Sequence, residues 1–237
     1  MSPTSGVIGE AWALYKAHWR HLLTFSFGVY LAVAIIGALL AAALTWVGAI
    51  LAVFISLVGF FWLQAALVKA VDDVRDGRAD LSLGETFAAA REHLGAVAVA
   101  GILAALGLIV GFLLLIVPGL VLMTWWSVII PVVVLENRSA GESFGRSREL
   151  VRGHGWGVFG VIVLVILLLI GFQIVLSIIL SPAADWLQGF LSQVISGTLT
   201  APFTTSVLTL LYFRLRAAKE PAAAPMGGPE PPPATPA

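Results

Sequence analysis

Cations at the edge of a bilayer attract anionic lipid headgroups by about 1 kcal/mol each, and three arginines of this chain are spaced for that role. They fall within SAGESFGRSRELVRG at residues 139–153, in a chain of which only 11% is charged. Two further cations occupy matching positions in similar upstream stretches. The candidate headgroup-binding residues are Arg146, Arg148, Arg152, Arg91 and Lys16. The same charges also orient a membrane protein, so the sequence leaves both roles open.

A second set of polar side chains lies in an otherwise apolar stretch near the C-terminus. Gln193, Ser196, Thr200 and Thr204 recur at helical spacing and would share one face of a helix. Such a stripe lines a polar path in some membrane proteins, but Ser, Thr and Gln also bond simply between helices. We favour packing and keep the path as the alternative.

Other chemistry finds little support in the residues. The chain has no cysteine, and its four histidines show no metal-ligand spacing. The acidic stretch DDVRDGRAD at 72–80 resembles a calcium loop, but Leu83 stands where an EF-hand needs glutamate, so we predict a solvated loop with a turn at Gly77. No nucleophile motif or carboxylate pair is evident. We therefore expect no metal, no cofactor, no catalytic residue and no enzymatic activity.

The elements that would position these residues are membrane spans. The chain is 59% hydrophobic, and residues 21–68 and 93–135 contain no Asp, Glu, Lys or Arg, while 153–213 contain only Asp185. A span needs about 20 residues, so each run is long enough for a hairpin of two helices. The predicted spans are 22–44, 49–69, 95–117, 120–136, 157–180 and 189–212.

The charges predict how these spans are oriented. With six spans, all 13 Lys and Arg residues fall on one side of the membrane, and the three short connections on the other side carry only Asp185. The positive-inside rule makes the basic side cytoplasmic, with both termini there. Trp46 and Trp186 fall where an aromatic belt on the opposite side is expected.

A repeated segment precedes each hairpin. SLGETFAAAREHL at 82–94 matches the first thirteen residues of the 139–153 stretch at six positions, and a fainter copy, VIGEAWALYKAHW, lies at 7–19. The copies align Glu10, Glu85 and Glu142, and the Ser-x-x-Glu spacing in the last two predicts a capping box. Each copy predicts a short amphipathic helix at the membrane interface.

Glycine and proline mark the remaining features. Pro118 and Gly119 predict the break between the third and fourth spans, whereas Pro131 and Pro202 predict kinks inside the fourth and sixth. We expect a membrane domain at 1–217 and a disordered, Pro/Ala-rich cytoplasmic tail at 218–237. The predicted fold is an all-α polytopic integral membrane bundle with six transmembrane helices in three hairpin units, each preceded by an interfacial helix.

One stretch also resembles a known family. The order of Pro118, Gly119, Pro131 and Glu136, followed by Ser147, Leu150, Arg152, Gly153, Trp156 and the closing LLYFRLR at 210–216, is similar to the membrane domain found in some glycerophosphoryl diester phosphodiesterases and also found alone. The resemblance implies a helical bundle in a bacterial plasma membrane. It does not imply the diesterase reaction, because the catalytic barrel is a separate domain of roughly 250 residues.

These observations favour a non-enzymatic membrane protein that acts as a scaffold or lipid-interacting factor in bacterial envelope maintenance. The alternative is a transporter or flippase for an amphiphilic small molecule or lipid. The expected partners are membrane lipids, including anionic headgroups, and either another membrane protein or a second copy of the chain. No nucleic-acid partner is expected.

Overall fold

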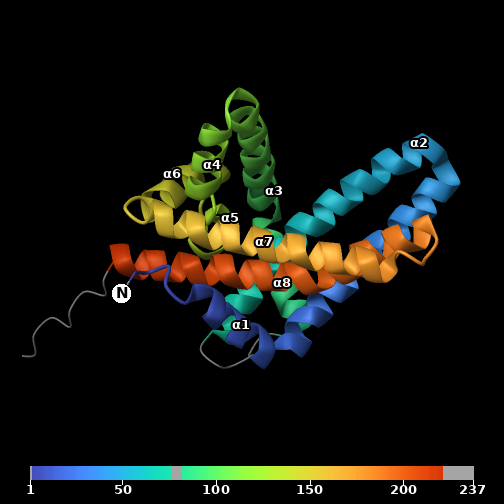
Figure 1. Ribbon diagram of the computed structural model, residues 1–237, viewed down its shortest axis with the longest axis horizontal. Coiled ribbons are helices and arrows are strands. Elements are labelled where there is room, and N and C mark those ends of the chain that lie inside the picture. The colour runs from blue at the N-terminus through green and yellow to red at the C-terminus, as the bar shows by residue number, and fades with distance from the viewer. Residues whose placement is uncertain (1, 76–81, 221–237) are drawn as a thin grey trace, which may run out of the picture.

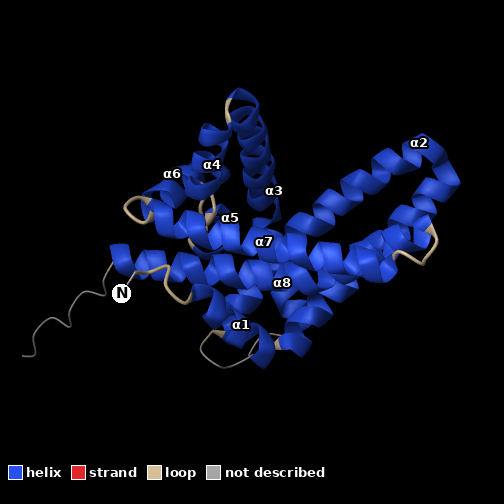
Figure 2. Ribbon diagram, viewed as in Figure 1, coloured by secondary structure: helices blue, strands red, loops and turns tan. Residues whose placement is uncertain are grey.

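The structure, a computed structural model, describes residues 2–75 and 82–220 as helices joined by short loops, with no strand in these ranges (Figure 2). The predicted turn at Gly77 and residues 221–237 of the predicted tail lie outside the described residues. The helices are α1 (Val7–Ala17), α2 (Trp19–Val74), α3 (Leu83–Leu114), α4 (Ile116–Trp125), α5 (Ile129–Leu135), α6 (Ala140–Val151), α7 (Gly155–Leu180) and α8 (Asp185–Lys219).

Six segments of the described chain are long and apolar enough to cross a membrane, so the predicted all-α, six-span architecture is confirmed. Most extend beyond the predicted ranges, and α8 continues through Lys219, two residues into the predicted tail. The segments are Trp19–Leu44, Trp46–Val74, Gly84–Leu114, Ile116–Leu135, Gly155–Leu180 and Asp185–Lys219.

Helix α2 contains the first two spans, and it stays helical through the bend at which it turns back on itself (Figure 1). A Cβ atom at Gly48 would lie 1.9 Å from the Leu40 carbonyl oxygen, so the bend needs a residue without a side chain. Below the bend the two arms run antiparallel, and a Cβ atom at Gly37 would lie 3.7 Å from Cβ of Ala52. The bend falls within the predicted connection.

The fourth span is broken rather than kinked. Residues 126–128 form a turn between α4 and α5, and Pro131 is the third residue of α5. The predicted kink at Pro131 is therefore wrong, because a first-turn N–H has no intrahelical acceptor and proline fits there without cost. The third span ends at Leu114, and the break falls at Leu115. The predicted break at Pro118 and Gly119 is therefore wrong, because both residues lie in the first turn of α4, where proline is tolerated. Pro202 does lie inside α8.

The amphipathic segments behave differently in the three copies. The first and third are separate helices, α1 and α6, but the second is the beginning of α3, which runs on into the span. The expected separate helix at 82–94 is thus absent. The third copy ends at Gly153, whose φ of +91° breaks the helix, whereas Ala96 holds the aligned position. A residue with a Cβ atom disfavours that left-handed geometry.

The packed core lies at the charged ends of the hairpins. Three apolar clusters unite α1, α6, the turn before α5 and the charged ends of α2, α3, α7 and α8. Beyond this body the hairpin tips extend in different directions (Figure 1). Trp46 and Trp186 at two of the tips are 72% and 75% exposed. The arms therefore present most of their apolar surface to the surroundings.

Candidate functional site

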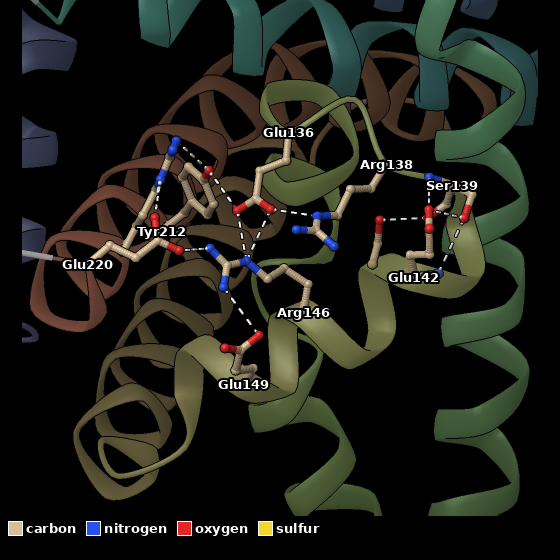
Figure 3. Close-up of polar contacts among 10 residues, drawn as sticks. Glu136, Arg138, Ser139, Glu142, Arg146, Glu149, Tyr212 and Glu220 are labelled. Atoms are coloured by element: carbon tan, nitrogen blue, oxygen red, sulfur yellow. Dashed lines mark hydrogen bonds and ion pairs between the residues drawn. The ribbon is translucent and has the colours of Figure 1, made fainter.

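Glu136 is the largely buried centre of a set of ion pairs whose outer members are exposed (Figure 3). Its carboxylate accepts hydrogen bonds from Arg146 Nε at 3.0 and 3.1 Å, from Arg138 Nε at 2.7 Å and from the Tyr212 hydroxyl at 3.1 Å. The side chains of Glu136 and Arg146 are only 9% and 10% exposed. A carboxylate so buried needs donors in place of water, and here three residues supply them.

Arg146 extends these contacts toward the end of α8. Its Nη1 donates to Glu149 at 3.2 Å, and its Nη2 donates to Glu220. Glu220 also accepts from Arg216 Nε at 3.1 Å, and Arg216 Nη1 donates to the Tyr212 hydroxyl at 3.3 Å. Three carboxylates thus balance three guanidinium groups. We call this set the Glu136 cluster: Glu136, Arg138, Arg146, Glu149, Tyr212, Arg216 and Glu220.

Hydrogen bonding keeps the cluster charged. Burial by itself lowers the pKa of Arg146, but hydrogen bonds to Glu220, Glu136 and Glu149 outweigh burial and raise the pKa above its usual value. Hydrogen bonds from Arg146 and Arg216 lower the pKa of Glu220. Because a buried ion deprived of its partner is strongly unfavourable, these contacts hold α6 and α8 to the end of α5.

Local sequence explains how α6 and α3 present their side chains. Ser139 Oγ accepts from the Glu142 backbone N–H at 3.4 Å, while Glu142 Oε2 accepts from the Ser139 N–H at 3.1 Å. Ser82 and Glu85 form the same reciprocal pair, so both predicted capping boxes are confirmed. The Ser139 side-chain hydrogen bond lowers the pKa of Glu142. In α1 no capping box forms, and Glu10 instead accepts from Arg214.

The charged ends of the hairpins meet at one end of the molecule. The Arg75 guanidinium lies 3.8 Å from the centre of the Phe213 ring, and Arg214 bonds to Glu10 and to the Ser5 carbonyl. Tyr212, on the same turn of α8, reaches Glu136. The residues around Arg75 and those around Arg146 therefore lie at the same end, as the charge pattern predicts. Arg78 lies outside the described residues.

The five predicted headgroup-binding cations are spread over three elements. Arg146 is buried in the Glu136 cluster, where a lipid would have to compete with three carboxylates. The other four are exposed: Arg148 lies 4.2 Å from the Trp125 ring, Lys16 lies 5.7 Å from the Trp12 ring, Arg152 ends α6 and Arg91 lines a hollow at the start of α3. Lipid binding by these residues stays a prediction.

The predicted polar stripe does not face a single cavity. Gln193 lines a 590 Å³ cavity between α2 and α8, together with Tyr30 and Ser56. Thr200 lines a separate 510 Å³ groove between α1, α7 and α8, and its hydroxyl donates to the Ser196 carbonyl at 2.7 Å. Thr204 is half-buried. Gln193 and Thr200 thus line different hollows, and Ser196 and Thr204 line neither of them.

Sequence reasoning missed the residues that organise the charged end. Glu136, Tyr212 and Glu220 were not among the predicted site residues, although Glu136 directly follows the uncharged run 93–135. The bond from the Thr205 hydroxyl to Gln64 Oε1, 2.8 Å long and joining α8 to α2, was also missed. No local pattern pairs residues so distant in the chain.

Among the described residues, no group of three or more His, Asp and Glu side chains lies close enough to hold a metal ion. Compared with protein-family models, with curated proteins and with solved structures, the chain gave no match. The geometry therefore defines the class of protein, an all-α polytopic membrane protein with a charged end. Any more specific function must be argued from its residues.

Proposed function

We propose that this protein is a non-enzymatic scaffold or lipid-interacting factor of the bacterial plasma membrane that serves in envelope maintenance, with both termini in the cytoplasm. The bacterial setting comes from the resemblance to the phosphodiesterase membrane domain. The observation that carries the proposal is the set of four exposed cations, Lys16, Arg91, Arg148 and Arg152, none of which forms an ion pair within residues 2–75 and 82–220.

Unpaired cations at the end of a bundle of uncharged spans suit contact with phosphate headgroups, because the lipid supplies the missing counter-charge. The spans add a large apolar surface that only lipid or another membrane protein can cover. We also include an internal repeat in the proposal, supported by the two identical capping boxes at Ser82 and Ser139. A second copy of the chain or another membrane protein remains a proposed partner for the arms.

The lipid part is tested by changing Lys16, Arg91, Arg148 and Arg152 together to Gln in the full-length chain. Quantitative mass spectrometry of the purified protein should show about a tenfold loss of retained phosphatidylglycerol. The control changes Arg20, Lys69, Arg75 and Lys219 to Gln, which removes the same charge outside the repeated segments. Equal losses in both variants would show that total charge alone governs retention and would contradict a role for these segments.

The orientation part uses the absence of cysteine from the natural chain. Single cysteines at Arg75 and Arg152 should react with a membrane-impermeant maleimide only after bacterial cells are opened, whereas cysteines at Trp46 and Trp186 should react in intact cells. If the cysteines at positions 75 and 152 were labelled from opposite faces of the membrane, the proposed topology would be overturned.

The alternative, a transporter or flippase for an amphiphile, is favoured by one observation. The 590 Å³ cavity beside α8 is lined by Gln193, Tyr30 and Ser56, which place polar groups among apolar spans. However, Thr200 faces a different groove, so the stripe offers no continuous path. Transport of a fluorescent lipid in proteoliposomes that is abolished by Gln193→Leu would favour the alternative over the scaffold.

A further inference from the structure

One face of the α2 hairpin carries an apolar slot of 550 Å³, a size typical of ligand sites. Its lining runs from Thr24 to Ile36 along the first arm, and at about 1.5 Å per residue these twelve steps span about 18 Å. The hydrocarbon core of a bilayer is about 30 Å thick, so the slot is about as deep as one leaflet.

The slot opens sideways toward the surrounding lipid. The arms are closed at its floor, where a Cβ atom at Gly59 would come within 2.8 Å of Val33. At its rim, Gly28 is exposed with nothing within 4 Å of its Cβ position, and Phe54 is 63% exposed. A chain from the bilayer can therefore enter without passing through the protein.

A second hollow, of 700 Å³, lies at the charged end of the slot. Trp62 of α2 and Phe87 of α3 line both hollows and form the wall between them. The wall is held in place because Trp62 Nε1 donates to the Phe87 carbonyl at 3.0 Å and the two rings meet edge to face at 5.3 Å. The apolar slot and the outer hollow are thus adjacent, one on each side of the two rings.

The outer hollow contains one charge of each sign. Arg91 and Glu92 both line it, and neither forms an ion pair within the described ranges 2–75 and 82–220. A phosphate matches the guanidinium, and an ammonium group beside it matches the carboxylate. The rings of Trp62 and Phe87 add a surface that favours ammonium. A purely anionic headgroup would meet the Glu92 carboxylate unfavourably.

We propose that the slot and the outer hollow together bind one phospholipid with a zwitterionic amine headgroup. One acyl chain lies in the slot, the phosphate contacts Arg91 and the ammonium group contacts Glu92. The inference rests on the proposed lipid-interacting function and names the lipid class for one of the repeated segments.

The slot is tested with Gly28→Leu, which fills open space at the rim, and with Gly171→Leu as the matched control. Gly171 is also exposed, in α7, with nothing near its Cβ position. Purified full-length protein is mixed with equal amounts of dioleoyl phosphatidylethanolamine and dioleoyl phosphatidylglycerol, and bound lipid is counted by native mass spectrometry. Gly28→Leu should lower bound phosphatidylethanolamine about tenfold, and the control should not. Unchanged phosphatidylethanolamine binding by Gly28→Leu would contradict the proposal that an acyl chain lies in the slot.

The headgroup assignment is tested with two substitutions of exposed side chains that leave the fold intact. Arg91→Gln should lower binding of both lipids about fivefold. Glu92→Gln should lower phosphatidylethanolamine binding alone and turn the preference toward phosphatidylglycerol. If Glu92→Gln still prefers phosphatidylethanolamine to phosphatidylglycerol, the zwitterionic headgroup assignment is contradicted. That result would stand even if the variant lacking Lys16, Arg91, Arg148 and Arg152 loses anionic lipid as proposed above. The two proposals therefore fail separately.

Discussion

The segments that begin α3 and α6 share their local chemistry but have opposite surroundings. Each starts with a capping box, and each directs a phenylalanine edge to face against a tryptophan, with Phe87 5.3 Å from Trp62 and Phe144 4.9 Å from Trp126. At α6 the half-buried Trp126 ring also fills the space beside Gly107. At α3 the corresponding rings separate two hollows.

The charges differ in the same way. Arg146 of α6 is buried in the Glu136 cluster, and the aligned residue at the start of α3 is Ala89, which carries no charge. Arg148 lies over Trp125, whereas the aligned Arg91 faces an open hollow. One copy thus forms a closed joint at the Glu136 cluster, and the other borders an open hollow. The comparison teaches that the capping box determines where the helix begins, and the neighbouring span determines what the helix can do.

The largest expected effect is on the closed joint. Arg146→Gln leaves Glu136 buried without its main partner and should lower the free energy of unfolding by about 3 kcal/mol. Arg91→Gln should change it by less than about 0.5 kcal/mol. Thermal unfolding in detergent micelles measures both. Similar losses of unfolding free energy in the two variants would contradict the difference between the closed joint at α6 and the open hollow at α3.

Packing around Trp126 should show the next largest effect. A Cβ atom at Gly107 would lie 2.5 Å from the Trp126 ring, so Gly107→Ala should destabilise the protein by about 1 to 3 kcal/mol. Gly95→Ala, also in α3 but with nothing within 4 Å of its Cβ position, is the matched control. If Gly107→Ala and Gly95→Ala lowered the stability to thermal unfolding equally, the Trp126 ring would not pack tightly against Gly107.

Removal of the capping box should destabilise the start of α3 and the start of α6 equally. Ser82→Ala and Ser139→Ala each remove one capping box and should each cost about 1 kcal/mol of local stability. Hydrogen exchange of the Glu85 and Glu142 amides measures the two losses separately. Ser→Asp at either position keeps a capping oxygen and should restore most of the protection. A marked inequality between the two losses would mean that tertiary contacts, not the caps, hold one of the starts.

The smallest effect is the pH dependence that Glu220 contributes to the closed joint. The lowered pKa of Glu220 means that its ion pairs contribute full stability above its ordinary value of about 4.5 and lose that contribution as the pH falls through the lowered value. Glu220→Gln should flatten this part of the stability profile. Arg91→Gln should leave it unchanged. An acid-side profile that Glu220→Gln does not alter would show that Glu220 is not paired in solution.

Much of the fold follows from short-range patterns. The uncharged runs of 48 and 43 residues, and the run 153–213 with only Asp185, are too long to cross a bilayer once and therefore return, which is why all six spans were predicted. The caps at Ser82 and Ser139 were also predictable, because both partners lie within one turn of helix. The break at residues 126–128 and the continuity of α3 were not, because each depends on how neighbouring elements pack.

By itself, the sequence determined the class of the protein, the number of spans, the single charged end and two helix starts, because hydropathy and capping act within about 20 residues of chain. Only the tertiary structure decided which cations are buried and which are free. Arg146 meets Glu136 across 10 residues and Glu220 across 74, and Arg91 shares its hollow with Trp62 of the preceding hairpin. Such pairings arise from packing between helices, where burial and the need to satisfy each charge select the partners.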